Sequence, residues 1–230
     1  MPFVRTIFSE LERVIVPQPV TLGVTSSFSK RRWPRDGVRK IIASEFMSAD
    51  GYIVGPSEDM GWVTNNFNEE MGRYAGDLMK SMDTILLGRV TYQIMVNAWP
   101  NWTEKQSPGA DKMNSTPKVV LSRTLKKAPW GRYEPGTIID DDVEGKIGEL
   151  KRKPGKNIVV YGSANLVQNL TRMGLIDEYQ LLLHPILLGS GKPLFGKMAR
   201  PVALKLLRAE NFRNGVNLLC YEPKTISKSG

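Results

Sequence analysis

The sequence predicts an α/β protein in which helices cover both faces of a mostly parallel central sheet, closed by an antiparallel C-terminal hairpin. Three patterns support this class. Short, fully apolar runs recur along the chain, amphipathic runs lie between them, and an Asn214-Gly215 turn signal separates two strand-like runs near the C-terminus. Strands buried on both faces have uninterrupted apolar runs, and their alternation with helices is typical of a parallel sheet.

Strands are expected where Val, Ile and Leu are concentrated between polar or glycine-containing segments. The runs that meet this condition are residues 39–48, 83–88, 117–123, 136–140, 156–162 and 176–185. The last part of the chain, 201–223, carries two further runs about the Asn-Gly turn, which predicts the hairpin.

Helices are predicted from apolar residues that recur at intervals of three or four. The clearest case is 65–82, whose apolar face consists of Phe67, Met71, Tyr74, Leu78 and Met82. Further helices are expected at 89–99, about 141–150 and 163–173. The glycine- and proline-containing segments 49–63 and 100–116 are expected to be loops, the second with one helical turn.

The chain is expected to hold one domain with short extensions. Residues 1–37 carry prolines, serines and a basic cluster without a sustained period, so we expect an irregular or disordered N-terminal extension. Residues 38–224 form the predicted domain, and 225–230 a flexible tail.

The composition limits the possible functions. The net charge is +9, of which residues 1–40 contribute +5, so the body of the protein is only mildly basic. This excess fits solubility or attraction for an anionic small molecule better than nucleic-acid binding. Cys220 and His184 are single residues of their type, so we expect no disulfide and no metal site built from these residue types. Without an apolar run long enough for a membrane span or a secretory signal, we expect a cytoplasmic protein with no membrane partner.

Three strands end in small or polar residues just before a helix or turn. The first ends at Gly88, and Arg89 and Thr91 follow in the first turn of the next helix. Free amides and the positive end of the helix dipole favour a phosphate there, and Arg89 can form a fork with its oxygens. A helix start with a solvated arginine is the equally probable plain interpretation.

The other two strand ends repeat the arrangement. Ser122 and Arg123 offer a hydroxyl and a guanidinium, while Gly162 and Ser163 open the helix that continues with Ala164 and Asn165. A simple Ser N-cap explains the last of these by itself. Because ligands bind at the carboxyl ends of strands in such sheets, the three together predict a long, multiply phosphorylated ligand such as a dinucleotide.

Three further features are weighed against plain structural roles. Asp50 follows the first strand, either as a turn-forming Asp-Gly or as a carboxylate that orients substrate or relays a proton. His184 is expected to be a hydrogen-bonded strand residue rather than a catalyst. The GSGK sequence at 189–192 lacks the remaining residues of a P-loop and is predicted to be a tight glycine loop.

Five stretches carry a family resemblance. They are KIIASEFMSADGYI (40–53), TILLGRVTYQ (84–93), KVVLSRTL (118–125), IVVYGSANLVQNL (158–170) and GLIDEYQLLLHPILLGSGKPLF (174–195). The chain resembles the dihydrofolate reductase-like superfamily, and within it the stand-alone relatives of the riboflavin-biosynthesis reductase domain, the C-terminal domain of RibD. The resemblance spans about 39–222 and implies a three-layer α/β/α fold.

The resemblance also implies a function. It suggests an NADPH-dependent reductase that transfers hydride to a small pterin- or pyrimidine-like heterocycle or to a carbonyl compound, and a homodimer. The alternative is a non-catalytic nucleotide or ligand binder of the same fold. The cofactor-binding residues implied are Ala43, Gly88, Arg89, Thr91, Ser122, Arg123, Gly162, Ser163, Ala164, Asn165 and Leu166.

Residues around the acceptor are expected from the first loop. Asp50 is the predicted catalytic carboxylate, and Ser48, Tyr52, Trp62 and Phe67 are the predicted substrate-binding residues. Core packing is an equally good interpretation of Trp62 and Phe67. No metal is expected in the site.

Overall fold

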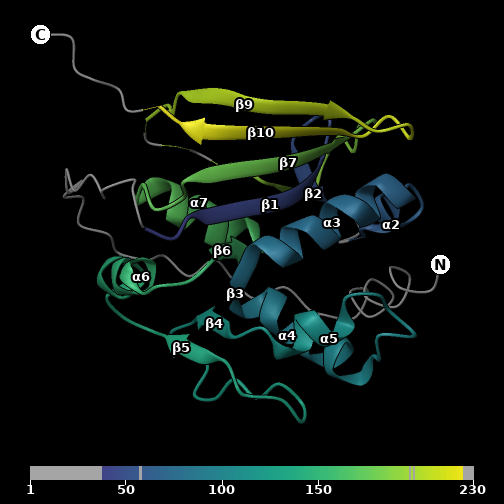
Figure 1. The fold of residues 1–230 in the computed structure, drawn as a ribbon. Coiled ribbons are helices and arrows are strands. Elements are labelled where there is room, and N and C mark those ends of the chain that lie inside the picture. The colour runs from purple at the N-terminus through teal and green to yellow at the C-terminus, as the bar shows by residue number, and fades with distance from the viewer. Residues whose placement is uncertain (1–37, 57–58, 197, 199, 225–230) are drawn as a thin grey trace, which may run out of the picture.

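A computed structural model describes residues 38–56, 59–196, 198 and 200–224, and shows one large sheet with helices on both faces (Figure 1). The expected N-terminal extension (1–37) and C-terminal tail (225–230) lie outside the described residues. The predicted α/β class with a mostly parallel sheet is confirmed.

The sheet has eight strands in the order β5-β4-β3-β6-β1-β7-β10-β9. They are β1 (Ile41–Ser48), β3 (Met82–Gly88), β4 (Lys118–Leu121), β5 (Thr137–Ile139), β6 (Asn157–Val160), β7 (Glu178–His184), β9 (Leu204–Asn211) and β10 (Asn217–Pro223). All pairs from β5 to β7 are parallel, whereas β10 is antiparallel to both β7 and β9. The predicted C-terminal hairpin is therefore confirmed.

The helices occupy two layers. They are α2 (Gly61–Thr64), α3 (Glu69–Ser81), α4 (Arg89–Ala98), α5 (Ala110–Ser115), α6 (Val143–Arg152) and α7 (Ala164–Arg172), with a 3-10 turn η2 (Trp99–Asn101) after α4. Ile147 of α6 and Leu170 of α7 pack into the core on one face of the sheet. Tyr92 of α4 and Met71 of α3 belong to the clusters on the other face.

The first three residues of β1, Ile41–Ala43, show why successive residues of a central strand can all be apolar. Ile41 and Ala43 point into the core under α6 and α7, while Ile42 belongs to the cluster on the opposite face. Because both faces of the sheet are covered, successive side chains of a central strand are all buried and gain from leaving water.

A small second sheet was not predicted. It pairs β2 (Tyr52–Val54) with β8 (Lys192–Pro193), so that the loop after β1 meets the glycine loop after β7. Gly191 has φ +129°, and a Cβ there would collide with the Val54 carbonyl oxygen. The GSGK sequence is thus a tight glycine loop, as predicted, and its last glycine is required by this close approach.

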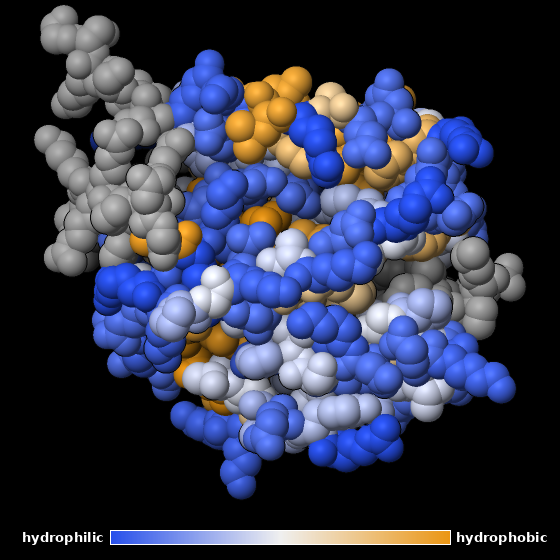
Figure 2. Space-filling model, in the orientation of Figure 1, coloured by the Kyte–Doolittle hydropathy of each residue, from blue (hydrophilic) through white to orange (hydrophobic). Residues whose placement is uncertain are grey.

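Strand β9, at one end of the sheet order, has no neighbouring strand on its outer side. Strand β9 is the sheet edge and is exposed over most of its length, with Leu206 50% and Leu207 44% accessible. Figure 2 shows apolar side chains gathered at the top of the molecule, where β9 lies in Figure 1. None of the helices in the described part of the chain combines the length and apolarity needed to cross a bilayer.

Candidate active site at the carboxyl edge of the sheet

The carboxyl ends of β3, β4 and β6 lie side by side. Gly88 is in register with Leu121 of β4, and its N–H donates to the Gly162 carbonyl at 3.4 Å. Ser122, the residue after β4, donates its N–H to Ile139 of β5 at 3.0 Å. The fold therefore brings the three predicted strand-end sites together on one edge, which we call the carboxyl rim.

Helix α4 begins on this rim without a side-chain cap. Gly88 occupies the N-cap position, where it has no side chain to accept a hydrogen bond from the first amides. Arg89 and Thr91 are half-buried in the first turn, and the Arg89 guanidinium donates to Gln93 Oε1 at 2.9 Å. The first turn thus presents unsatisfied amides, a cation and a hydroxyl at one place.

Helix α7 begins in the same way, which corrects the expectation of a Ser N-cap. Ser163 sits at the N-cap position, but its hydroxyl makes no capping hydrogen bond. A Cβ at Gly88 would lie 3.0 Å from Ser163 Oγ, so glycine lets the starts of α4 and α7 approach closely. Gly162 has φ +71°, a conformation that favours glycine. Among the residues that follow, Ala164 and Leu166 are buried and Asn165 is exposed.

The turn after β4 holds two further predicted cofactor residues. Ser122 is buried, and its Oγ accepts from the N–H groups of Thr124 at 3.2 Å and Leu125 at 3.0 Å. Its hydroxyl therefore shapes the turn, while Arg123 beside it is exposed. Ala43 lies deeper, fully buried on β1 between Val160 of β6 and Tyr179 of β7.

Glu45 is a polar residue of the site that we did not predict. It is 7% exposed on β1, and its Oε1 accepts from the Gly162 N–H at 2.7 Å. Burial disfavours the carboxylate and raises the pKa of Glu45 to about 8, although the hydrogen bond from Gly162 acts in the opposite direction. A single acidic residue inside the apolar run 41–48 was the sequence signal that could have identified it.

The loop after β1 is fixed by Asp50. Its carboxylate accepts from Ser48 Oγ at 2.6 Å and from the N–H groups of Leu188 at 3.1 Å and Gly189 at 2.7 Å. These hydrogen bonds lower the pKa of Asp50, with the Ser48 hydroxyl as the main cause. Ser48 itself is fully buried and also accepts from the Tyr52 N–H at 2.9 Å. The predicted catalytic role of Asp50 stays a prediction, and its contacts assign it a loop-holding role as well.

The remaining predicted substrate residues line the other face of β1. Trp62 lies on α2 with its ring centroid 4.9 Å from that of His184, at the end of β7. Phe67 packs against the cluster that contains Met71 and Leu182. His184 was expected to be hydrogen-bonded, which is wrong, since neither ring nitrogen has a partner in the described part of the chain.

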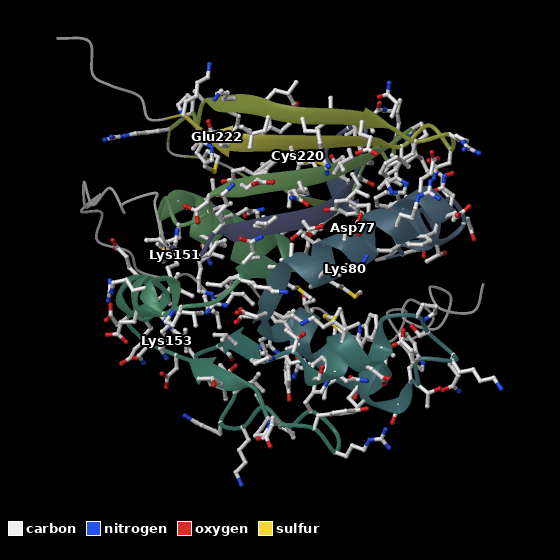
Figure 3. All side chains as sticks on the ribbon, viewed as in Figure 1. Asp77, Lys80, Lys151, Lys153, Cys220 and Glu222 are labelled. Carbon is white, nitrogen blue, oxygen red and sulfur yellow. The ribbon has the colours of Figure 1, made fainter. Side chains whose placement is uncertain are left out.

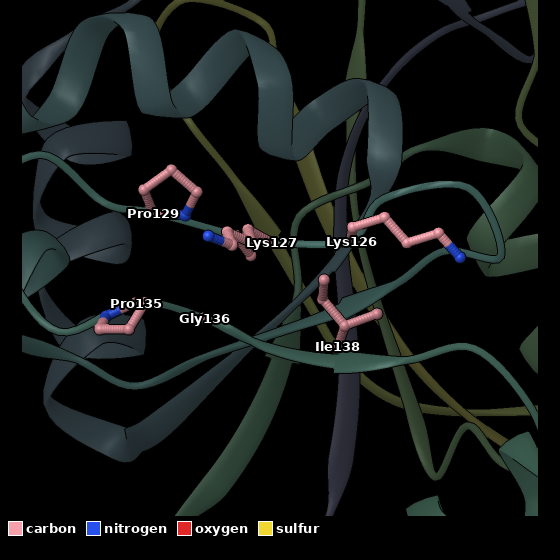
Figure 4. Close-up of a pocket in the computed structure, with 7 residues that line it drawn as sticks. Lys126, Lys127, Pro129, Pro135, Gly136 and Ile138 are labelled. Atoms are coloured by element: carbon pink, nitrogen blue, oxygen red, sulfur yellow. The ribbon is translucent and has the colours of Figure 1, made fainter.

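One cavity lies away from the rim. An open cavity of about 410 Å³ is lined by Lys126, Lys127, Ala128, Pro129, Pro135, Gly136 and Ile138 (Figure 4). Because Gly136 precedes β5 and lies against Lys118 at the start of β4, this cavity sits toward the amino ends of the strands. Over the described residues, no group of three or more His, Cys, Asp or Glu is placed to hold a metal ion.

Comparison with known proteins identifies the family. The family model of the RibD C-terminal domain matches residues 39–218. The chain belongs to the RibD C-terminal domain family. Within this family it is 31% identical over 189 residues to the uncharacterized protein YyaP of Bacillus subtilis (strain 168), covering 80% of this chain and 94% of that protein. It is also 27% identical to YwjB of the same organism, over 78% and 96% of the two chains.

Solved structures support the dihydrofolate reductase-like fold of this RibD-family domain. A protein of Shewanella sp. PV-4 attributed to riboflavin biosynthesis superposes with a TM-score of 0.67 and 24% identity, covering 81% of this chain and 99% of that one. Dihydrofolate reductase from Enterococcus faecalis, complexed with NADP(H) and RAB-propyl, gives 0.53 and 12%, covering 82% and 99%. At these identities the likeness establishes the fold alone, and the predicted dihydrofolate reductase-like fold is confirmed.

Proposed function

We propose that this RibD-family domain is an NADPH-dependent reductase that transfers hydride to a small pterin- or pyrimidine-like heterocycle or to a carbonyl compound. The observation that carries the proposal is the convergence of two helix starts and a polar turn on the carboxyl rim. Gly88 and Ser163 leave the first amides of α4 and α7 without side-chain caps. Two adjacent sites of this kind suit a ligand with several phosphates.

The residues on the rim fit such a cofactor. Arg89 and Thr91 would contact its phosphates at the start of α4, and the amides from Ser163 onward would hold the pyrophosphate at the start of α7. Arg123 would pair with the adenosine 2′-phosphate, with Ser122 shaping the turn that carries it. The close approach at Gly88 supports this assignment, because an added Cβ would lie 3.0 Å from Ser163 Oγ and would crowd the space between the two helix starts.

The chain's own residues would bind and orient, because hydride chemistry belongs to the cofactor. Bound NADPH supplies the hydride. Ala43 and the loop from Ser48 to Tyr52 would flank the reacting ring, and Asp50 keeps that loop in place through its bonds to Leu188 and Gly189. Glu45 holds the Gly162 N–H and so fixes the corner from which α7 starts.

The alternative is a nucleotide- or ligand-binding protein of the same fold that does not catalyse the reaction. Hydride transfer requires few protein groups, so the rim is compatible with both functions. The two differ only in turnover, so the rim supports the binding of the cofactor, and the RibD-family membership of the chain favours the reductase.

The test is NADPH binding followed by NADPH oxidation with a panel of pterin, pyrimidine, quinone and carbonyl acceptors. We expect binding, and oxidation with at least one heterocyclic acceptor. Tight binding without turnover on any acceptor would support the binder, and no binding of NADPH would refute the reductase.

Arg89→Ala is the matching variant for the cofactor site. We expect it to weaken NADPH binding by about 1.5–3 kcal/mol, the range for a hydrogen bond to a charged group. Arg73→Ala is the control, because Arg73 is paired with Glu69 on the exposed face of α3 and its loss changes the net charge equally. Unchanged affinity in Arg89→Ala would mean that the phosphates bind elsewhere.

We also propose that the partner of the chain is a second copy, which would cover β9. An edge strand of eight residues offers unpaired main-chain groups, and antiparallel pairing about a two-fold axis satisfies the same groups in both copies. The exposed Leu206 and Leu207 add apolar surface at that edge.

A further inference from the structure

Three buried nitrogen atoms cluster beside the loop that follows β1. His184 is 1% exposed at the carboxyl end of β7, opposite the fully buried Ser48 of β1. Its Nδ1 and Nε2 both lack a hydrogen-bond partner within the described residues, as does Nε1 of Trp62. The two rings meet edge to face, with their centroids 4.9 Å apart.

These unpartnered atoms are costly for the folded protein. An unsatisfied buried donor or acceptor costs about 1–3 kcal/mol, and most native proteins contain few of them. Nearby polar groups show the contrast, since the Tyr74 hydroxyl on the same face of the sheet bonds to both Ser44 and Gln180 at 2.8 Å. The local packing can therefore provide partners for buried polar groups, yet the three nitrogens of His184 and Trp62 have none among the described residues.

The chemistry of the cluster defines what would satisfy it. A neutral imidazole offers one N–H donor and one acceptor nitrogen, and an indole offers one donor only. Burial lowers the pKa of His184 to about 4, so the ring is neutral near pH 7. Phe46 forms a third aromatic wall, with its ring centroid 5.8 Å from that of His184. A flat, uncharged ring with carbonyl acceptors beside an N–H donor matches this set.

We propose that His184 and Trp62 are the specificity-determining pair for the acceptor, and that they bind the edge of an uncharged pyrimidine or pterin ring on which a ring N–H adjoins a carbonyl oxygen. This inference rests on the proposed reductase function and names the residues that would select its substrate. Trp62 was expected near the substrate on other grounds, whereas the role of His184 follows from the structure alone.

Access to the pair requires a displacement of α2. Trp62 lies on this single helical turn, which has no side-chain cap. Since the three nitrogens are buried and the two rings are in contact, a bound ring would have to separate the indole from the imidazole, and the hydrogen bonds it makes would offset that displacement.

The direct test uses the one histidine of the chain. In protein labelled with ¹⁵N-histidine, every imidazole resonance belongs to His184. With NADP⁺ present, 5-aminouracil is expected to shift these resonances, and 5-amino-1,3-dimethyluracil, which lacks the imide N–H, is expected to leave them unchanged. If neither 5-aminouracil nor 7,8-dihydrobiopterin shifts these resonances, the proposal is overturned.

Two substitutions separate binding from stability. His184→Phe and Trp62→Phe keep a ring but remove the unpartnered nitrogens, so we expect an unchanged or higher melting temperature and an at least tenfold weaker Kd for 5-aminouracil. Tyr74→Phe is the matched control, because it removes a partnered hydroxyl and is expected to lower the melting temperature without weakening 5-aminouracil more than twofold.

The outcomes are distinguishable from failure of the proposed function. NADPH affinity is measured in the same variants and is expected to stay within twofold of the wild type. If the nitrogens bind buried water only, His184→Phe leaves the 5-aminouracil Kd unchanged, which overturns the proposal while NADPH binding persists. Absence of NADPH binding in the wild type overturns the reductase function itself.

Discussion

The two edges of the parallel sheet differ in how their polar groups are satisfied. At the amino edge, Arg39 pairs with Asp83 and also donates to Thr84 Oγ1 at 2.6 Å and to the Lys156 carbonyl at 2.7 Å. At the carboxyl rim, both helix starts lack side-chain caps, and the nearby His184 nitrogens have no partner in the described part of the chain.

A second ion pair strengthens the amino edge. Lys151, labelled in Figure 3, is 2% exposed and lies 2.5 Å from Asp177 Oδ2, which also accepts from the Ile41 N–H at 2.8 Å. The charged groups at the amino edge thus pair with one another and stabilise the fold. At the carboxyl rim, hydrogen-bond donors are left without side-chain partners, which lowers stability. Substitutions at one edge should therefore change folding, and those at the other should change binding.

The largest expected effect is at the amino edge. Asp83→Ala leaves the buried Arg39 guanidinium without its charged partner. Because the Asp83 side chain is 37% exposed, we expect a loss of about 2–4 kcal/mol, less than the roughly 3–5 kcal/mol typical of a fully buried pair. Urea unfolding should show this loss, with NADPH affinity unchanged. Asp77→Ala is the control, because the Asp77–Lys80 pair (Figure 3) is exposed and worth less than about 1 kcal/mol. Equal losses in the two variants would contradict the distinction between the edges.

The next effect is a change in cofactor preference. Arg123→Ala is expected to weaken NADPH by about 1.5–3 kcal/mol and NADH much less, because only NADPH carries the 2′-phosphate that the exposed guanidinium would pair with. Isothermal titration with both nucleotides measures the difference. Equal losses for the two would argue against the 2′-phosphate role, and the free energy of unfolding should not change.

A third effect is a pH dependence of stability that originates at Glu45. Below pH 4.5 this carboxyl is protonated in both the folded and the unfolded chain, whereas between pH 4.5 and about 8 only the folded chain keeps the proton. Its contribution to stability is therefore fully present below pH 4.5, is lost progressively as pH rises from 4.5 to about 8, and does not change further above that. Glu45→Gln should flatten this part of the curve of unfolding free energy against pH, and an unchanged slope would rule out Glu45 as its source.

The smallest effect on stability is expected at the sheet edge. Leu206→Lys places a charge on the exposed strand β9, where surface substitutions usually change stability by less than about 0.5 kcal/mol. Charges on an edge strand oppose pairing with a second copy. Light scattering should show a dimer for the wild type and a monomer for the variant, and a monomeric wild type would refute the proposed dimer.

Much of the fold could be predicted because its strands carry a strong local signal. The run 156–162 was expected as a strand and forms β6 (Asn157–Val160), whose last three residues are apolar and buried because both faces of the sheet are covered. The sheet of β2 and β8 was missed because two- and three-residue strands have no periodicity, and their pairing joins loops distant in the chain. Cys220 lies on β10 (Figure 3) and is 3% exposed.

The site, too, contains residues that could be predicted from the sequence and residues that could not. Gly88, Arg89 and Ser163 could be proposed from sequence because a strand that ends in glycine before a helix is a local pattern. Glu45 and the unpartnered state of His184 could not, because they depend on which strand lies beside which. Ser163 also shows that a residue type typical of a cap does not decide where its hydroxyl points.

The sequence by itself determined the alternation of strands and helices and the residues that end each strand, because hydrophobic periodicity and turn chemistry act between near neighbours in the chain. Only the tertiary structure decided that three strand ends share one rim, that Glu45 faces Gly162, and that His184 is buried beside Trp62 without a protein partner among the described residues. These features depend on strand order and burial, and hydrogen-bond satisfaction and pKa are properties of the surroundings rather than of the residue.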